Sequence, residues 1–212
     1  MLFINNDTEF GPALLQQLAD GVEEHQAEMA APKIMFFGKE QIIWSAGGGF
    51  KSLRGYAGFH HGYGERDHGQ YDSPRMVDHG PACCLLVRDS VFARIGMMDD
   101  RYFAYVDDSD FCYRAKRAGL KLVYLPWARV DHKAHSLTGG LGSDFMMRYT
   151  TRNRVYFMLK HFGPVRGLYY VPAYQFHLLF EFLGRSFNLS KFLLRERAFF
   201  EGLRLWRQSI VR

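Results

Sequence analysis

Three aspartates close together are the strongest candidates for chemistry in this sequence. Asp107, Asp108 and Asp110 lie within four positions of the segment YVDDSDFC. Neighbouring carboxylates repel one another, so at least one of them is expected to have a raised pKa, which suits a general base, unless a cation or hydrogen bonds compensate. Helix capping and the positive end of the helix dipole explain one or two of the three comfortably and the third poorly. We therefore predict a proton acceptor at the start of a helix.

A second candidate site combines a carboxylate with a histidine. Asp7 follows a short apolar segment, and His132 closes another in ARVDHKAHS. A carboxylate at the carboxyl end of a strand, with Asn6 beside it, can hold a hard divalent cation shared with phosphate oxygens of a ligand. Taken alone, Asp7 is better explained as a turn cap and His132 as a structural histidine. A metal site requires the sheet to bring the two side chains together.

Helices and strands in alternation must position these groups. Short apolar and β-branched segments predict strands at residues 2–4, 33–37, 41–45, 82–88, 120–126 and 128–132. Helical spacing and end signals predict a helix opening at Pro12 and helices over 90–96 and 108–119, closed by Gly96 and Gly119. This order predicts an α/β protein with a mostly parallel sheet flanked by helices.

Residues 47–71 interrupt this regularity. The segment is rich in Gly, His and Tyr and is longer than an ordinary connection. Its aromatic side chains, Phe50, Tyr56, Phe59 and Tyr63, favour a mobile loop that stacks on a sugar or a base. A disordered surface excursion is the alternative.

Composition limits the classes to which the chain can belong. With 212 residues, 48% of them hydrophobic, and only 7 prolines, the sequence is that of a globular protein and not of a disordered one. Its three cysteines form no CxxC pair, which disfavours a cysteine-ligated zinc site. The N-terminus has neither the basic region nor the cleavage site of a signal peptide, so we expect a cytoplasmic protein.

Charge is distributed unevenly along the chain. Residues 146–212 carry a net charge of +9, whereas residues 1–145 carry −4. Residues 167–180 are uncharged but too short to span a membrane, and Pro172 and Gln175 interrupt them. Residues 191–208 predict a basic amphipathic helix with Phe192, Leu193, Phe199, Leu203 and Trp206 on its apolar side. Packing on the protein and contact with a membrane are equally good explanations, and no nucleic-acid motif accompanies the arginines.

Several of these segments, in this order, resemble a known family. NNDTEF, IIWSAGGG and the long segment from VDHGPACC to DHKAHS are similar to the family 2 glycosyltransferases of the GT-A fold, especially the bacterial rhamnosyltransferase-like group. The resemblance covers roughly residues 1–160. It implies inverting transfer of a sugar from a nucleotide diphosphate sugar donor to a saccharide or lipid-linked acceptor hydroxyl, in the synthesis of cell-surface polysaccharide or glycolipid.

The resemblance also implies roles for individual residues. Asp108, paired with Asp107, matches the general base, and Asp7 and His132 match the ligands of a divalent metal, Mg or Mn. Asn5 and Asn6 match positions on the donor side. The acceptor side is implied to contain Trp44, Gly48, Ala82, Cys83 and Asp110. Asp107 stands where the family usually has Glu, and Ala82 stands where Gly is common.

The family pattern divides the chain into two parts. Residues 1–145 correspond to the C-terminal part of a GT-A catalytic domain, with the metal site and the acceptor side. Residues 146–212 form a helical, basic tail that could associate with the inner face of the cell membrane. The family's nucleotide-binding first strand and helix have no counterpart here. The alternative hypothesis is therefore a catalytically incompetent module for membrane docking or interaction.

Overall fold

The computed structural model describes residues 1–51, 57–133, 142–183 and 188–210, which belong to two compact units. The first, here called the sheet unit, comprises Met1–Phe50, Gly58–Asp99 and Asp108–Ser136. The second, the helical unit, comprises Lys51–Ala57, Asp100–Asp107 and Leu137–Arg212. Each unit is described by itself.

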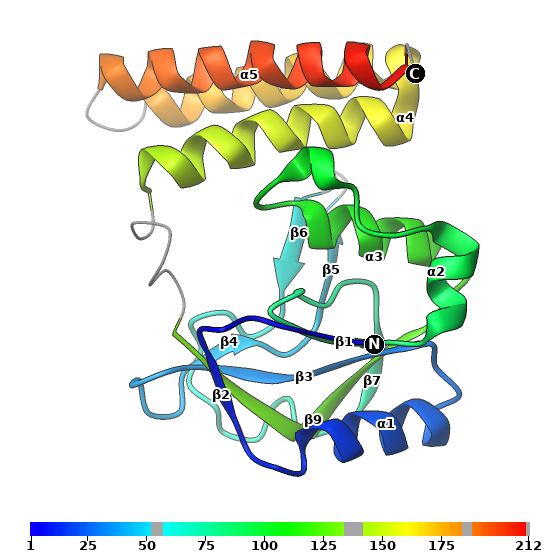
Figure 1. The fold of residues 1–212 in the computed structure, drawn as a ribbon. Helices are drawn as coiled ribbons and strands as arrows, with labels where there is room; N and C mark the ends of the chain where they lie inside the picture. The colour runs from blue at the N-terminus through cyan, green and yellow to red at the C-terminus, as the bar shows by residue number, and fades with distance from the viewer. Residues whose placement is uncertain (52–56, 134–141, 184–187, 211–212) are drawn as a thin grey trace. The chain divides into compact units, whose positions relative to one another are not determined.

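A mixed β-sheet forms the centre of the sheet unit (Figure 1). Its strands follow the order β1 (Leu2–Ile4), β8 (Cys84–Val87), β3 (Met29–Phe36), β9 (Leu122–His132) and β2 (Thr8–Phe10), with β4 (Ile43–Ser45) on β3 and β7 (Arg75–Val77) on β9. β3 and β9 are parallel, whereas β1–β8, β3–β8, β3–β4, β2–β9 and β7–β9 are antiparallel. The α/β class is confirmed. The expectation of a mostly parallel sheet is wrong, because short antiparallel strands flank the parallel pair β3–β9 on both sides.

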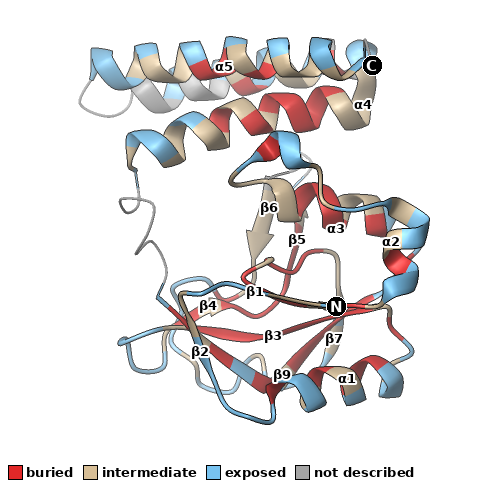
Figure 2. Cartoon of the chain, in the orientation of Figure 1, coloured by how far each residue is buried: buried red, intermediate tan, exposed pale blue. Residues whose placement is uncertain are grey.

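Helices cover both faces of this sheet. Alternate residues of β3 point to opposite faces, so Ala30 and Ile34 pack against α1 (Leu14–Glu24) in one apolar cluster. Met29 and Ala31 pack in another cluster, against α2 (Asp89–Ile95) and α3 (Asp107–Arg117). Figure 2 shows that β3 and β9 are buried along most of their length. The result is a three-layer α/β/α arrangement.

Most predicted elements occur, but two predicted strands, 120–126 and 128–132, form one continuous strand, β9. The helix after Pro12 is α1, and α2 and α3 are followed by Gly96 and Gly119, both with positive φ. β9, however, runs through Pro126, which was expected to end a strand. The β3–β9 register shifts at this point, since Pro32 pairs with Leu125 and Lys33 with Arg129. A bulge of this kind accommodates a proline, which has no amide hydrogen for the sheet.

The glycine-rich region is more regular than expected. β5 (Gly48–Lys51) and β6 (Ala57–His60) pair in a two-stranded sheet. The turns that follow are tied to β3, because the ammonium group of the buried Lys33 binds the carboxylates of Asp67, at 2.8 Å, and Asp72. Tyr56 lies outside the described residues. The described part of this region thus contains a two-stranded sheet followed by turns, and stacking of its aromatic side chains on a sugar or a base stays a prediction.

Two helices dominate the helical unit. α4 (Asp144–Leu183) is kinked at Gly163, which has a φ of 68° and precedes Pro164. α5 (Leu189–Ile210) packs against α4. Their contact is close at Gly202, where an added Cβ would lie 2.4 Å from the carbonyl oxygen of Arg152. Residues Val155, Met158, Leu159, Tyr174 and Phe199 form the buried core. No helix in the described part of the chain is both long and apolar enough to cross a membrane.

The helical unit also contains a constrained segment that leads into α3. Phe103, Tyr105 and Val106 have positive φ angles, which β-branched and bulky residues rarely adopt. The side-chain amide of the buried Asn153, on α4, donates to the carbonyl oxygens of Tyr102, Ala104 and Tyr105 at 2.7–2.9 Å. This amide stabilises the unusual conformation immediately before Asp107 and Asp108.

Candidate functional site

Strand direction brings three distant segments to one edge of the sheet. β1 and β3 are each antiparallel to β8, and β3 is parallel to β9, so β1, β3 and β9 run in the same direction. The end of β1, the start of β8 and the end of β9 therefore lie at the same edge. Asp7 follows β1, Cys83 precedes β8 and His132 ends β9. In open α/β sheets ligands bind at the carboxyl ends of strands.

Asp7 and His132 are in direct contact. Pairing of β2 with β9 places Thr8 opposite His132, and the amide of Lys133 donates to the carbonyl oxygen of Asp7 at 2.8 Å. Asp7 Oδ1 lies 3.3 Å from His132 Nε2, and both side chains are largely buried. The proximity that the metal hypothesis required is therefore present. The sequence analysis missed β2, which brings the two residues together.

The Asp7–His132 pair has the chemistry of a partial metal site. Ligands on adjacent corners of an octahedral ion with bonds of about 2.1 Å are about 3 Å apart, close to the separation observed here. Among the described residues no group of three or more His, Cys, Asp or Glu side chains could hold an ion. Mg²⁺ is commonly bound by one or two side chains together with substrate phosphates. The pair could therefore supply two ligands of such an ion.

A row of rings connects this pair to a second group. The ring of Trp44, on β4, lies 4.7 Å from the rings of both His132 and His60. His60, at the end of β6, lies 5.3 Å from the ring of His79 and contacts Ser45 Oγ through Nδ1 at 3.1 Å. The two ends of the site are thus linked by packed side chains within the sheet unit.

Asp108 lies at the other end of this row. Its Oδ1 is 3.8 Å from His79 Nε2 and accepts a hydrogen bond from the amide of Ser109 at 2.6 Å. Ser109 Oγ is 3.2 Å from the same His79 nitrogen. The backbone of Gly58 is packed so tightly here that an added Cβ would lie 2.8 Å from Ser109 Oγ. His79 is 2% exposed, and its Nδ1 has no hydrogen-bond partner among the described residues.

His60 and His79 are the site residues that sequence reasoning missed. His79 precedes Gly80 in a segment that was noted for the family resemblance, and His60 lies in the glycine-rich segment GFHHGYG, two residues from both Gly58 and Gly62. The nearby glycines, which permit close backbone approach, were the available signal. Contacts between residues so far apart in the sequence could not be deduced from spacing.

Asp108 has an unusually acidic carboxyl group. Burial alone would raise its pKa, but the nearby His79 imidazole, the charge of His60 and the hydrogen bond from the Ser109 amide together lower the pKa to about 2. Asp108 therefore falls under the exception that the sequence-based prediction allowed, because two histidines and a hydrogen bond compensate for the repulsion within the acidic cluster. Asp108 is ionised at neutral pH.

His60 is expected to make stability depend on pH. Burial, followed by the positive charge of His79, lowers its pKa to about 4, although Asp108 opposes the shift. Below pH 6.5, the ordinary pKa of a histidine, His60 binds a proton in the unfolded chain but not in the folded chain until the pH falls to about 4. The free energy of unfolding should therefore fall between pH 6.5 and 4, by up to about 3 kcal/mol. Urea unfolding of the wild type and His60→Asn at several pH values tests this, and parallel pH profiles would contradict it.

The remaining predicted residues lie in different environments. Asn5 and Asn6 are exposed in the turn between β1 and β2, while Ala82 is half-buried beside Cys83. Burial raises the pKa of the Cys83 thiol, with further contributions from Cys84, Asp108 and Asp7. The backbone of Gly48 bonds to the amides of Asp78 and His79, and a Cβ there would lie 1.9 Å from the carbonyl oxygen of Phe59. Asp107 begins α3.

Asp110 lies in the protein interior. It is fully buried and binds Arg114 Nε at 2.8 Å, and Arg114 also donates to the carbonyl oxygen of Met97 after α2. This pairing favours a structural role over the predicted contact with an acceptor. We expect Asp110→Ala to lower the free energy of unfolding by about 3 kcal/mol, because the Arg114 charge loses its partner. Chemical denaturation measures this loss, and an unchanged stability with weaker acceptor binding would restore the original assignment.

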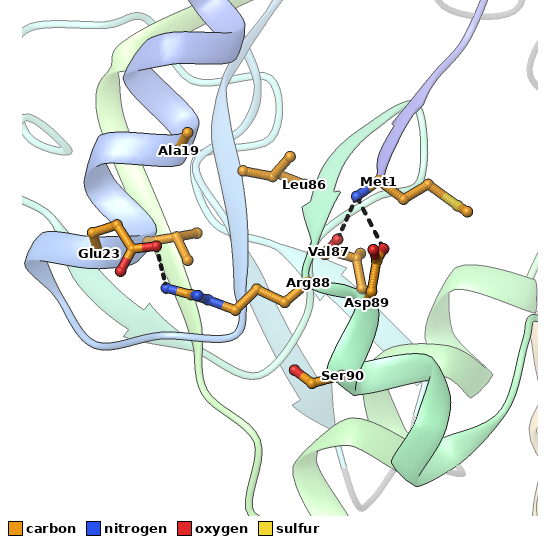
Figure 3. A pocket seen from close by; sticks show the side chains of 9 residues that line it. Met1, Ala19, Glu23, Leu86, Val87, Arg88, Asp89 and Ser90 are labelled. Carbon is orange, nitrogen blue, oxygen red and sulfur yellow. Dashed lines mark hydrogen bonds and ion pairs between the residues drawn. The ribbon is translucent and has the colours of Figure 1, made fainter.

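A separate hollow lies near the N-terminus (Figure 3). It has a volume of about 420 Å³ and is lined by residues of α1, the end of β8 and the start of α2. In Figure 3 the amino group of Met1 binds the Val87 carbonyl oxygen, and Arg88 binds Glu23 at 2.7 Å. None of the predicted site residues lines this hollow.

Parts of the chain are similar to proteins of known activity. Over 92 residues, 43% of this chain, it is 38% identical to N-acetylglucosaminyl-diphospho-decaprenol L-rhamnosyltransferase of Mycobacterium tuberculosis. Over 63 residues, 30% of this chain, it is 40% identical to rhamnosyltransferase WbbL of Escherichia coli. Over 54 residues, 26% of this chain, it is 33% identical to the low-salt glycan biosynthesis hexosyltransferase Agl10 of Haloferax volcanii.

These similarities cover limited stretches. They span 30%, 24% and 18% of the lengths of the three relatives, in the same order. The chain matches no family model. The partial relatives are nevertheless all named sugar transferases, which agrees with the resemblance in the sequence.

Proposed function

We propose that this chain contributes the metal and acceptor side of an inverting glycosyltransferase of the GT-A type, in polysaccharide or glycolipid synthesis. The observation that carries the proposal is the arrangement of Asp7, His132 and Asp108 around one edge of the sheet, linked through Trp44, His60 and His79. The names of the partial relatives support the same class. The donor is a nucleotide diphosphate sugar, and the acceptor is a saccharide or lipid-linked hydroxyl.

Asp108 is the proposed general base. The acceptor oxygen attacks the anomeric carbon, the bond from that carbon to the diphosphate breaks, and the hydroxyl proton passes to the Asp108 carboxylate. A carboxylate with a pKa of about 2 is a weak base. It accepts the proton late, when bond formation has made the attacking hydroxyl acidic. His79 is a positioning residue, because it holds the carboxylate in its ionised form.

Asp7 and His132 are the residues that would hold a divalent ion. When bound, Mg²⁺ or Mn²⁺ stabilises the negative charge of the departing diphosphate. The β2–β9 pairing fixes the two side chains before any ligand arrives, so little ordering is needed on binding. Asn5 and Asn6, in the exposed turn beside Asp7, are the proposed contacts to the donor.

Calorimetry of this chain with Mn²⁺ and nucleotide diphosphate sugars tests the proposal. Micromolar binding that requires Mn²⁺, together with transfer to a saccharide or polyprenyl-linked acceptor, is the expected result. Absence of both binding and transfer would favour the alternative, a non-catalytic module for docking or interaction. Binding without transfer would leave the donor site in place and remove the catalytic assignment.

A further inference from the structure

The outward face of α5 carries both apolar and basic side chains. Leu189, Leu193 and Phe200 are 56%, 47% and 63% exposed, although burial of such residues is normally favourable. Arg197, Arg204 and Arg207 are also exposed. These six residues follow one another at intervals of three or four, so they share one face of the helix, here called the α5 face. Phe199, Leu203 and Trp206 pack on the opposite side, in the core of the helical unit.

The acidic residues of α5 are engaged elsewhere. Glu196 accepts a hydrogen bond from Gln175 of α4 at 2.5 Å, and Glu201 binds Arg148 of α4 at 3.0 Å. Both carboxylates therefore stabilise the packing of α5 on α4. Because Glu196 and Glu201 pair with residues of α4, the arginines of the α5 face give that face a net positive charge.

α4 has an exposed apolar stripe after its kink. Val165, Tyr169, Phe176 and Phe180 are 68–80% exposed and lie on one face of the helix, at helical spacing through Pro172. Residues 167–180 carry no formal charge. Exposed apolar groups of this size mark surfaces that contact a partner or a lipid.

We propose that the α5 face is a docking surface for an anionic lipid bilayer. Arginines interleaved with exposed leucine and phenylalanine match negatively charged headgroups next to an apolar interior. A second copy of the chain would set the same arginines opposite one another, which disfavours self-association through this face. A nucleic acid would engage the arginines but not the exposed apolar groups. The helix lies along the membrane surface, with the α5 face toward the lipid.

Co-sedimentation of the full chain with vesicles tests this proposal. Phosphatidylcholine vesicles that contain phosphatidylglycerol should bind it, and pure phosphatidylcholine vesicles should bind it much less. Each arginine near such a surface strengthens binding by about fivefold, so R197Q/R204Q/R207Q should weaken it about a hundredfold. L193S/F200S should also weaken binding, and salt should weaken it by screening.

A matched control separates the α5 face from net charge. K39Q/R117Q/K121Q removes three exposed charges from the sheet unit and should bind vesicles nearly as wild type. Equal losses in both triple variants, or wild-type binding by R197Q/R204Q/R207Q with unchanged melting, would overturn the proposal. A dimer in vesicle-free solution that L193S/F200S dissociates would overturn it in favour of an interface between copies. Binding needs no sugar donor, so failure of the proposed transfer reaction would leave this result unaffected.

Discussion

Asp108→Asn is expected to lower the rate of sugar transfer by about 10²- to 10⁴-fold, the usual contribution of a general base. The amide is nearly isosteric with the carboxylate and can still accept a hydrogen bond from the Ser109 amide, so the start of α3 should be preserved. It cannot take the acceptor proton. Transfer of radiolabelled sugar from the nucleotide donor, under single-turnover conditions, measures the chemical step directly.

Asp107→Asn is the matched control for this experiment. It removes an adjacent carboxylate at the first residue of α3, whereas Asp108 is the residue that contacts His79 and Ser109. We expect a much smaller loss of rate from Asp107→Asn. A larger loss from Asp107→Asn would transfer the role of base to Asp107. Similar rates in the wild type and Asp108→Asn, with similar melting temperatures, would remove Asp108 from the mechanism.

The pKa of Asp108 makes a further distinction possible. Because His79 holds the carboxylate ionised, His79→Phe should raise the pKa of Asp108 and move the acidic limb of the pH–rate profile upward. A purely structural role for His79 would lower stability without moving that limb. The pH profile of transfer therefore separates positioning of the base from support of the fold.

Local signals in the sequence were enough to find most elements and the residues at their ends. Apolar spacing and the glycines after α2 and α3 act over a few residues, so they are readable without a fold. The direction of the strands is not local. Three-residue strands such as β1 and β2 are too short to carry a pattern, and their pairing decided whether the sheet was parallel or mixed.

The candidate site likewise has a part that the sequence predicted, the identity of its residues, and a part that it did not, their environment. Asp7, Asp108 and His132 could be proposed because each lies at or next to the end of an element and matches a family pattern. Their environment could not be predicted, since His60, on β6, and His79, after β7, approach Asp108 from distant parts of the chain and lower its pKa. The acidic cluster suggested mutual repulsion, but Asp110 is neutralised by Arg114 inside the protein. Long-range pairing, which depends on the whole fold, therefore determines the chemistry at each position.

Asp7→Ala and His132→Ala are each expected to reduce transfer by about a hundredfold or more. Each removes one of the two proposed ligands, and loss of the ion would forfeit several kcal/mol of charge stabilisation on the leaving diphosphate. Titration of Mn²⁺ in the presence of uridine diphosphate, followed by electron paramagnetic resonance, should show weaker Mn²⁺ binding in both variants. This readout does not depend on turnover.

Asp131→Asn provides the control for the metal experiment. Asp131 adjoins His132 in β9 but is partly exposed and faces Arg129 at 3.5 Å, so its replacement should leave Mn²⁺ binding unchanged. If Asp7→Ala and His132→Ala melt at lower temperature but keep the wild-type Mn²⁺ affinity, the pair is a structural contact between β2 and β9. Weaker Mn²⁺ binding with little change in melting would instead support the metal role, because removing a ligand affects the ion more than the strand pairing that surrounds it.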